Sequence, residues 1–135
     1  MGRPLRNLWS RFEAEVLERI VVGHPTITPA SNRLMAMIDA EGTQIGELAR
    51  RAGVAKQSMA EAVRSLEAQG LVRREPDPDD RRAKRVVLTD DGWTGLRAGR
   101  DAADAVHRRW SEVLGERDMA RLVQLLEKLD ARLRE

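Results

Sequence analysis

Apolar residues recur every three or four positions along residues 5–20, and polar residues fill most of the positions between them. This spacing predicts an amphipathic helix with a broad apolar face. Gly23-His24-Pro25 ends the pattern, because proline disfavours a helical conformation in the residue before it. A second helix is expected to begin at Thr28-Pro29, where threonine suits the N-cap and proline the first helical position, and to end at Gly42.

Residues 43–70 carry two shorter helical patterns separated by a glycine turn. The apolar positions are Ile45, Leu48, Ala49 and Ala52 in the first pattern, and Met59, Val63 and Leu66 in the second. Gly53 and Gly70 come just after the two patterns, where a helix often needs a left-handed residue, which glycine supplies without steric cost. Two short helices joined by such a turn are the signature of a helix-turn-helix.

Two strand patterns, residues 71–75 and 85–89, follow the second of these helices. In the later one, the apolar residues Val86 and Leu88 lie two positions apart, which is the period of a strand. The connecting residues 76–84 contain two prolines and three aspartates, which favour a hairpin loop longer than a tight turn. A β-hairpin directly after a helix-turn-helix is a wing, and this one carries arginines at its tip.

The remaining residues form two more helical patterns. Thr89 suits an N-cap, Asp90 and Asp91 place negative charge where the helix dipole favours it, and Gly115 separates the two patterns. The last pattern has a heptad stripe of Met119, Leu122, Leu126, Leu129 and Leu133. With the N-terminal helix, these segments present more apolar surface than a small winged helix can cover. We therefore expect a homodimer; the alternative is a monomer in which they pack on their own chain.

Composition narrows the class of protein. The 135 residues suit one domain, and the net charge is +2. Residues 43–89 hold ten basic and seven acidic residues, a net charge of +3, as suits a surface that faces phosphates. Because cysteine is absent and the two histidines are far apart, we expect no disulfide, metal or other cofactor. No apolar run approaches the roughly 20 residues that span a bilayer, so we expect a cytoplasmic protein without a membrane partner.

The sequence resembles the multiple antibiotic resistance regulator (MarR) family of winged-helix transcription factors over nearly its whole length. The segments that carry the resemblance are 28–30, 45–49, 53–58, 66–72 and 77–84. The resemblance implies a mainly α-helical fold with a small β-hairpin wing: a winged helix-turn-helix flanked by N- and C-terminal dimerisation helices. We expect a single domain over residues 1–135, with the winged helix-turn-helix at 28–89 and the dimerisation helices at 1–27 and 90–135.

The second helix of the helix-turn-helix is expected to expose Lys56, Gln57, Ser58 and Arg64. The first three lie at its N-terminal end, the part of a recognition helix that meets base edges in the major groove. Glutamine can pair with adenine, and arginine or lysine with guanine. The alternative is an ordinary solvated helix face. Ala55 departs from the family, which usually has serine or threonine there, because alanine cannot supply a capping oxygen.

Asp80-Arg81-Arg82 resembles the Asp-x-Arg motif of the family's wing. The resemblance implies that Arg82 reaches the minor groove of DNA, where negative potential is concentrated, and that Asp80 holds an arginine in place. We expect phosphate contacts from the other basic residues nearby, Arg73, Arg74, Arg81 and Lys84. The alternative is a solvated loop with local ion pairs, each of which contributes little to stability.

The resemblance also implies a pocket for small, often anionic aromatic effectors between the dimerisation helices and the winged helix. Every aromatic residue of the chain lies outside residues 43–89. The candidates for such a pocket are Trp9, Phe12, Met37 and Trp93, with His24 and Arg33 near its rim. The alternative is that these residues are plain core.

The function predicted from these patterns and the resemblance is that of a homodimeric, sequence-specific regulator of transcription. It would bind a palindromic site in double-stranded DNA and act as a ligand-responsive repressor. One alternative is a winged helix that binds protein or RNA and has no operator. An enzyme is not expected, because no paired catalytic carboxylates, nucleophile elbow or phosphate loop is found.

Overall fold

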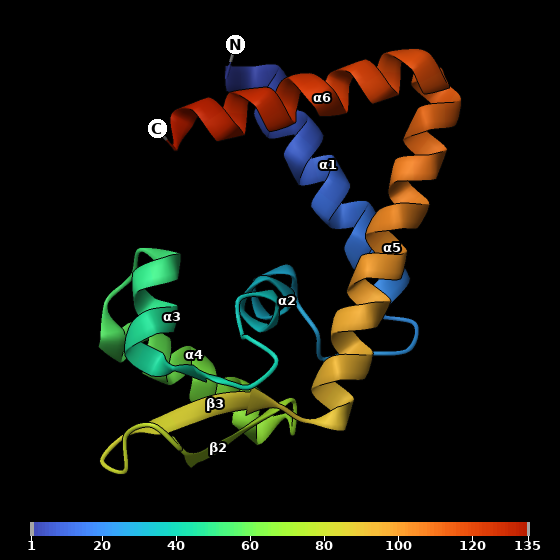
Figure 1. Ribbon diagram of the computed structural model, residues 1–135. Helices are drawn as coiled ribbons and strands as arrows, with labels where there is room; N and C mark the ends of the chain where they lie inside the picture. The colour runs from blue at the N-terminus through green and yellow to red at the C-terminus, as the bar shows by residue number, and fades with distance from the viewer. Residues whose placement is uncertain (1, 135) are drawn as a thin grey trace.

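Residues 2–134, which the computed structural model describes, form six helices and three strands. Their bounds are α1 Gly2–Ile20, α2 Pro29–Ala36, β1 Thr43–Gln44, α3 Ile45–Ala52, α4 Lys56–Ala68, β2 Val72–Pro76, β3 Lys84–Leu88, α5 Asp90–Leu114 and α6 Glu116–Leu133. Figure 1 shows α2, α3, α4 and the strands gathered at one end of the molecule, while α1 and α5 lead away from them towards α6. The predicted fold class, mainly α with a small β-hairpin wing, is confirmed.

Side-chain caps set the starts of α2 and α5. Thr28 Oγ1 accepts a hydrogen bond from the Ser31 N–H at 3.1 Å, and Thr89 Oγ1 accepts one from the Gly92 N–H at 3.1 Å. Each threonine has an extended backbone and satisfies an amide that the first turn of its helix leaves unpaired. Both helix starts predicted from the sequence are confirmed.

The wing hairpin belongs to a three-stranded antiparallel sheet with the strand order β1-β3-β2. β2 and β3 pair along their full length, beginning with Val72 opposite Leu88, so the predicted hairpin is confirmed. β1 consists of two residues, and Thr43 lies opposite Val86. The sequence does not predict β1, because two residues are too few to show a period.

The predicted end of α2 is wrong. The pattern placed it at Gly42, whereas the helix ends at Ala36 and Met37 is its C-cap. Two residues further on, the Asp39 N–H donates to Thr43 Oγ1 at 2.9 Å, a side-chain bond that competes with helix continuation. Gly42 instead has a φ of 104° in the turn into β1, where an added Cβ would lie 2.7 Å from Val87 Cγ1.

The core joins all the elements of the winged helix. Its fully buried side chains include five from α2, α3, α4 and β3: Met35, Leu48, Val63, Leu66 and Val86. These are apolar positions of the predicted helical and strand periods. Because burial of one face of α4 fixes which face is outside, the core also orients the polar side chains that could meet a partner.

Three glycines bring α5 unusually close to the winged helix. A Cβ at Gly92 would lie 2.0 Å from the Leu71 carbonyl oxygen, and one at Gly95 would lie 2.4 Å from Ile27 Cδ1. A Cβ at Gly99 would lie 2.5 Å from Asn32 Oδ1. In the sequence, Gly95 and Gly99 look like weak points of a helix, but in the structure they permit its close packing.

The contact at Gly92 generates a test of this packing. We expect Gly92→Ala to destabilise the protein by about 1–3 kcal/mol, because the Leu71 carbonyl belongs to the backbone and cannot rotate away. The matched control is Gly46→Ala on α3, where an added Cβ meets nothing within 4 Å and the gain in helix propensity is up to about 1 kcal/mol. Urea unfolding measures both. Equal stability of the two variants would contradict the close contact.

Candidate nucleic-acid interface

The polar face of α4 is turned outwards. Lys56, Gln57, Ser58 and Arg64 are exposed, and Met59, Val63 and Leu66 on the opposite face are buried. These are the four exposed candidates and the three buried positions expected from the helical period. The first three polar residues form the N-terminal end of the helix, so their side chains are accessible to a large ligand.

The turn before α4 is set by Gly53, which is the C-cap of α3 with a φ of 67°. This left-handed conformation is the one that glycine adopts at least cost, as predicted. Ala55 is the N-cap of α4 and makes no side-chain hydrogen bond to it. The exposed end of α4 therefore keeps amides without a side-chain acceptor from this position.

Hydrogen bonds order the tip of the wing. The Asp77 N–H donates to the Ala83 carbonyl at 3.1 Å, and the Arg82 N–H donates to Asp80 Oδ1 at 3.0 Å. Gln44 Nε2 donates to Asp77 Oδ2 at 2.7 Å, which ties the tip to β1 and lowers the pKa of Asp77. Asp80 thus holds Arg82 through its backbone, and the expected role of Asp80 in placing an arginine against DNA stays a prediction.

The basic candidates fall into two groups. Lys56, Arg64, Arg81, Arg82 and Lys84 are exposed and form no ion pair within residues 2–134. Arg73 and Arg74 of β2 have acidic neighbours: Arg73 Nη2 lies 3.5 Å from Glu75 Oε2, and Arg74 Nε lies 3.3 Å from Glu67 Oε2. Arg74 is half-buried, so its guanidinium faces α4 more than solvent.

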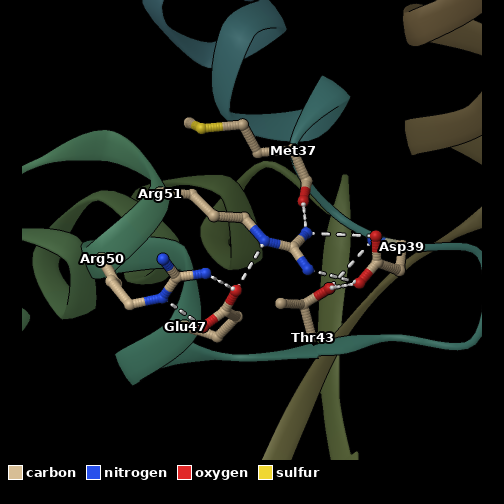
Figure 2. A network of polar contacts seen from close by, with 6 residues as sticks. All are labelled: Met37, Asp39, Thr43, Glu47, Arg50 and Arg51. Carbon is tan, nitrogen blue, oxygen red and sulfur yellow. Dashed lines mark hydrogen bonds and ion pairs between the residues drawn. The ribbon is translucent and has the colours of Figure 1, made fainter. Parts of the chain in front are cut away.

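A polar network joins α3 to the segment between α2 and β1. Figure 2 shows the Arg51 guanidinium between the carboxylates of Asp39 and Glu47. Arg50 and then Arg51 lower the pKa of Glu47 to about 2, and Arg51 lowers the pKa of Asp39. The spacing of Glu47 and Arg51 suggests a helical ion pair, but no sequence signal connects Arg51 with Asp39.

A cavity of about 90 Å³ lies between α1 and α2. Three of the effector-pocket candidates, Trp9, Phe12 and Arg33, line it, and Arg33 forms an ion pair with Glu13 at its edge. The other three candidates lie elsewhere. His24 is in the turn after α1, Met37 caps α2, and Trp93 of α5 packs against the core; Met37 also packs against the core.

A larger apolar groove of about 640 Å³ runs between α1, α5 and α6. Its walls include Leu8, Trp110, Val113, Leu122 and Leu125, and most of these apolar side chains are exposed. The stripe predicted for α6 also leaves Leu126, Leu129 and Leu133 exposed. A contiguous apolar surface of this kind is typical of a protein–protein interface.

Residues 2–134 contain no group of three or more histidine, cysteine, aspartate or glutamate side chains that could hold a metal ion. In the same residues, no helix is both long enough and apolar enough to cross a membrane.

Comparison with known proteins identifies the family. The profile of the MarR family matches residues 25–83. The transcriptional regulator HosA of Escherichia coli O111:H- is 32% identical over 126 residues, which are 93% of this chain and 90% of HosA. The chain belongs to the MarR family. The matched segment of this MarR-family chain contains every DNA-binding candidate except Lys84.

Solved MarR-family structures share the fold over almost the whole chain. The transcriptional repressor CouR, bound to a 23-mer DNA duplex, superposes with a TM-score of 0.76 at 27% identity, covering 96% of this chain and 92% of CouR. CouR from Rhodococcus jostii RHA1, bound to p-coumaroyl-CoA, superposes with a TM-score of 0.71 at 25% identity, covering 95% and 90%. The resemblance read from the sequence is thereby confirmed.

The uncapped start of α4 gives a prediction. We expect Ala55→Ser to stabilise the protein by about 1 kcal/mol, because serine supplies an acceptor for an amide in the first turn. Ala68→Ser, at the other end of the same helix, is the matched control and should be neutral or destabilising by a few tenths of a kcal/mol. Urea unfolding distinguishes them, and an equal effect of both serines would rule out capping as the cause.

Proposed function

We propose that this MarR-family protein is a homodimeric, sequence-specific transcriptional regulator that binds a palindromic DNA operator and acts as a ligand-responsive repressor. One observation carries the proposal: the N-terminal end of α4 is exposed, and the wing carries three exposed basic side chains, Arg81, Arg82 and Lys84, that form no ion pair within residues 2–134. An exposed helix end and a basic hairpin are the two parts with which a winged helix grips duplex DNA.

Each part has a different task in this proposal. Lys56, Gln57 and Ser58 lie where a recognition helix meets base edges, and glutamine has the geometry to pair with adenine. Arg82 would enter the minor groove, where negative potential is high. Arg64, Arg73, Arg81 and Lys84 would contact phosphates, which positions the protein without reading sequence. Arg74 is the least available of the candidates, because it is half-buried beside Glu67.

The apolar groove supports the homodimer. Exposed side chains of α1, α5 and α6 would be buried if the same surface of a second copy covered them, as in a two-fold interface. Two copies related in this way would carry two copies of α4. Such a pair suits an inverted repeat whose half-sites are about one helical turn apart.

The cavity beside α2 supports response to a ligand. Its lining of Trp9 and Phe12 suits an aromatic ring, and Arg33 could meet an anionic group once its pairing with Glu13 is broken. At about 90 Å³ it is smaller than the roughly 300–1,000 Å³ usual for small-molecule sites, so a ligand would have to part α1 and α2. That change would shift the two copies of α4 relative to each other and weaken operator binding.

Selection from a random duplex pool tests the function, and an arginine variant tests the wing. We expect selected sequences to form an inverted repeat with half-sites about 10 base pairs apart from centre to centre. Arg82→Ala should weaken binding to the selected duplex and reduce the salt slope of log K by about 1, because one cationic contact is lost. Fluorescence anisotropy over a salt series measures both quantities.

The control for Arg82 is Arg117→Ala, which removes the same charge from the exposed start of α6, far from the wing. It should leave the affinity and slope nearly unchanged. Identical curves for the two variants would show that the wing does not contact DNA. Equal binding of wild-type protein to every duplex would instead favour a module without an operator.

The dimer has its own test. The 15.2 kDa chain should sediment at twice that mass, and Leu125→Glu should shift it towards the monomer, because a charge buried in an apolar interface is costly. Val22→Glu is the control, since Val22 is 89% exposed in the turn after α1 and lies outside the groove. Sedimentation velocity is the measurement. A monomeric wild-type protein at micromolar concentration would refute the proposed dimer.

A further inference from the structure

Arg51 neither belongs to the exposed face of α4 nor lines the cavity, yet it joins three parts of the winged helix. Its Nη1 donates to the Met37 carbonyl at 2.7 Å and to Asp39 Oδ1 at 3.1 Å. Its Nη2 donates to Asp39 Oδ2 at 2.8 Å, and its Nε donates to Glu47 Oε1 at 3.0 Å. All three guanidinium nitrogens are therefore used, as Figure 2 shows.

The neighbouring Arg50 provides a comparison within the same turn of α3. It also pairs with Glu47, through Nε at 2.8 Å and Nη2 at 2.6 Å. Within residues 2–134 its side-chain hydrogen bonds stay within α3, and its side chain is 73% exposed, against 31% for Arg51. Two adjacent arginines thus share a carboxylate, but only Arg51 reaches outside its own helix.

Arg51 and its partner Asp39 lie next to the segments that lead into α4 and the wing. Arg51 is two residues before Gly53, the turn that leads into α4. Asp39 Oδ2 also accepts a hydrogen bond from Thr43 Oγ1 at 3.2 Å, and Thr43 pairs with Val86 in the wing strand β3. One carboxylate therefore connects the end of α3 with the sheet that carries the wing.

The hydrogen bonds of Arg51 are directional, unlike the apolar packing of the core. Leu48 and Ala49 bury one face of α3, but apolar contact is non-directional and resists small rotations weakly. A guanidinium that binds a carboxylate through two nitrogens fixes both distance and orientation. The Met37 carbonyl adds a third fixed point, at the C-terminal end of α2, where the helix dipole favours a cation.

We propose that Arg51 is a positioning residue for sequence readout, which acts through Asp39 to fix the angle of α4 relative to the wing. Arg51 keeps α4 and the wing in the relative orientation in which α4 meets base edges while the wing enters the minor groove. Loss of the Arg51–Asp39 pair lowers the preference for the operator over other DNA, while general attraction to phosphates is kept. This inference rests on the DNA-binding function proposed above.

The test uses two duplexes: the tightest binder selected from a random pool by wild-type protein, and a shuffled duplex of the same length and composition. The variants are Arg51→Met and Asp39→Asn, which remove the pair from either side, and Arg51→Lys, which keeps the charge but loses the two-nitrogen geometry. Arg50→Met is the matched control. Anisotropy titrations give each affinity, the ratio between duplexes and the salt slope.

We expect Arg51→Met and Asp39→Asn to lower the ratio of affinities about tenfold, comparable to the loss of one base-pair match. Their salt slopes should equal that of wild type. Arg51→Lys should also lose preference, and Arg50→Met should keep the wild-type ratio. Asp39→Asn removes a negative charge, so a phosphate-attraction effect would strengthen binding to both duplexes instead.

Other outcomes overturn the inference in recognisable ways. A salt slope reduced by about 1 with an unchanged ratio would make Arg51 a phosphate contact. Equal losses on both duplexes would mean that the pair only supports folding, because a lower folded fraction reduces both affinities alike. Full recovery by Arg51→Lys would mean that charge alone matters. If wild-type protein shows no preference between the duplexes, the proposed function itself fails.

Discussion

The close approach of α5 to the winged helix is the constraint on which the rest of the structure depends. Gly92 and Gly95 lack the side chains that would collide with Leu71 and Ile27, so the start of α5 lies directly on the body that contains α4. The other end of α5 leads into α6 (Figure 1), and both helices line the apolar groove. Because one continuous helix joins the two regions, a second copy held at the groove would also fix where its own α4 lies.

Local chemistry explains which parts of the fold the sequence predicts. The caps of Thr28 and Thr89 and the left-handed turn at Gly53 involve neighbouring residues only, so each leaves a readable signal. The end of α2 depends instead on Asp39 meeting Thr43 and on the pairing of β1 with β3. The first contact is a side-chain bond between residues four apart, and the second joins parts of the chain about 40 residues apart; a period of apolar residues reports neither.

The same distinction applies to the candidate interface. Helical period alone predicts that Lys56, Gln57 and Ser58 are exposed, because Met59 and Val63 must face the core. It does not predict that Arg74 lies against Glu67 of α4, nor that His24 and Trp93 lie away from the cavity that Trp9 lines. Charge type is visible in the sequence, but the choice of partner depends on strand register and helix packing.

Pairing among charges changes the meaning of the small net charge of the winged segment. Glu47 and Arg51 of α3 form an ion pair at 3.0 Å. Glu75 of β2 forms one with Arg85 of β3 at 2.6 Å. These two carboxylates lie beside the arginines that they bind. Within residues 43–89, the cations without an ion pair are Lys56 and Arg64 of α4 and Arg81, Arg82 and Lys84 of the wing. Four acidic residues of the same segment, Glu61 on α4 and Asp77, Asp79 and Asp80 in the wing loop, also form no ion pair within residues 2–134. The outward-facing excess of positive charge is therefore small, and attraction to DNA phosphates depends on where the individual cations lie and not on a large net charge.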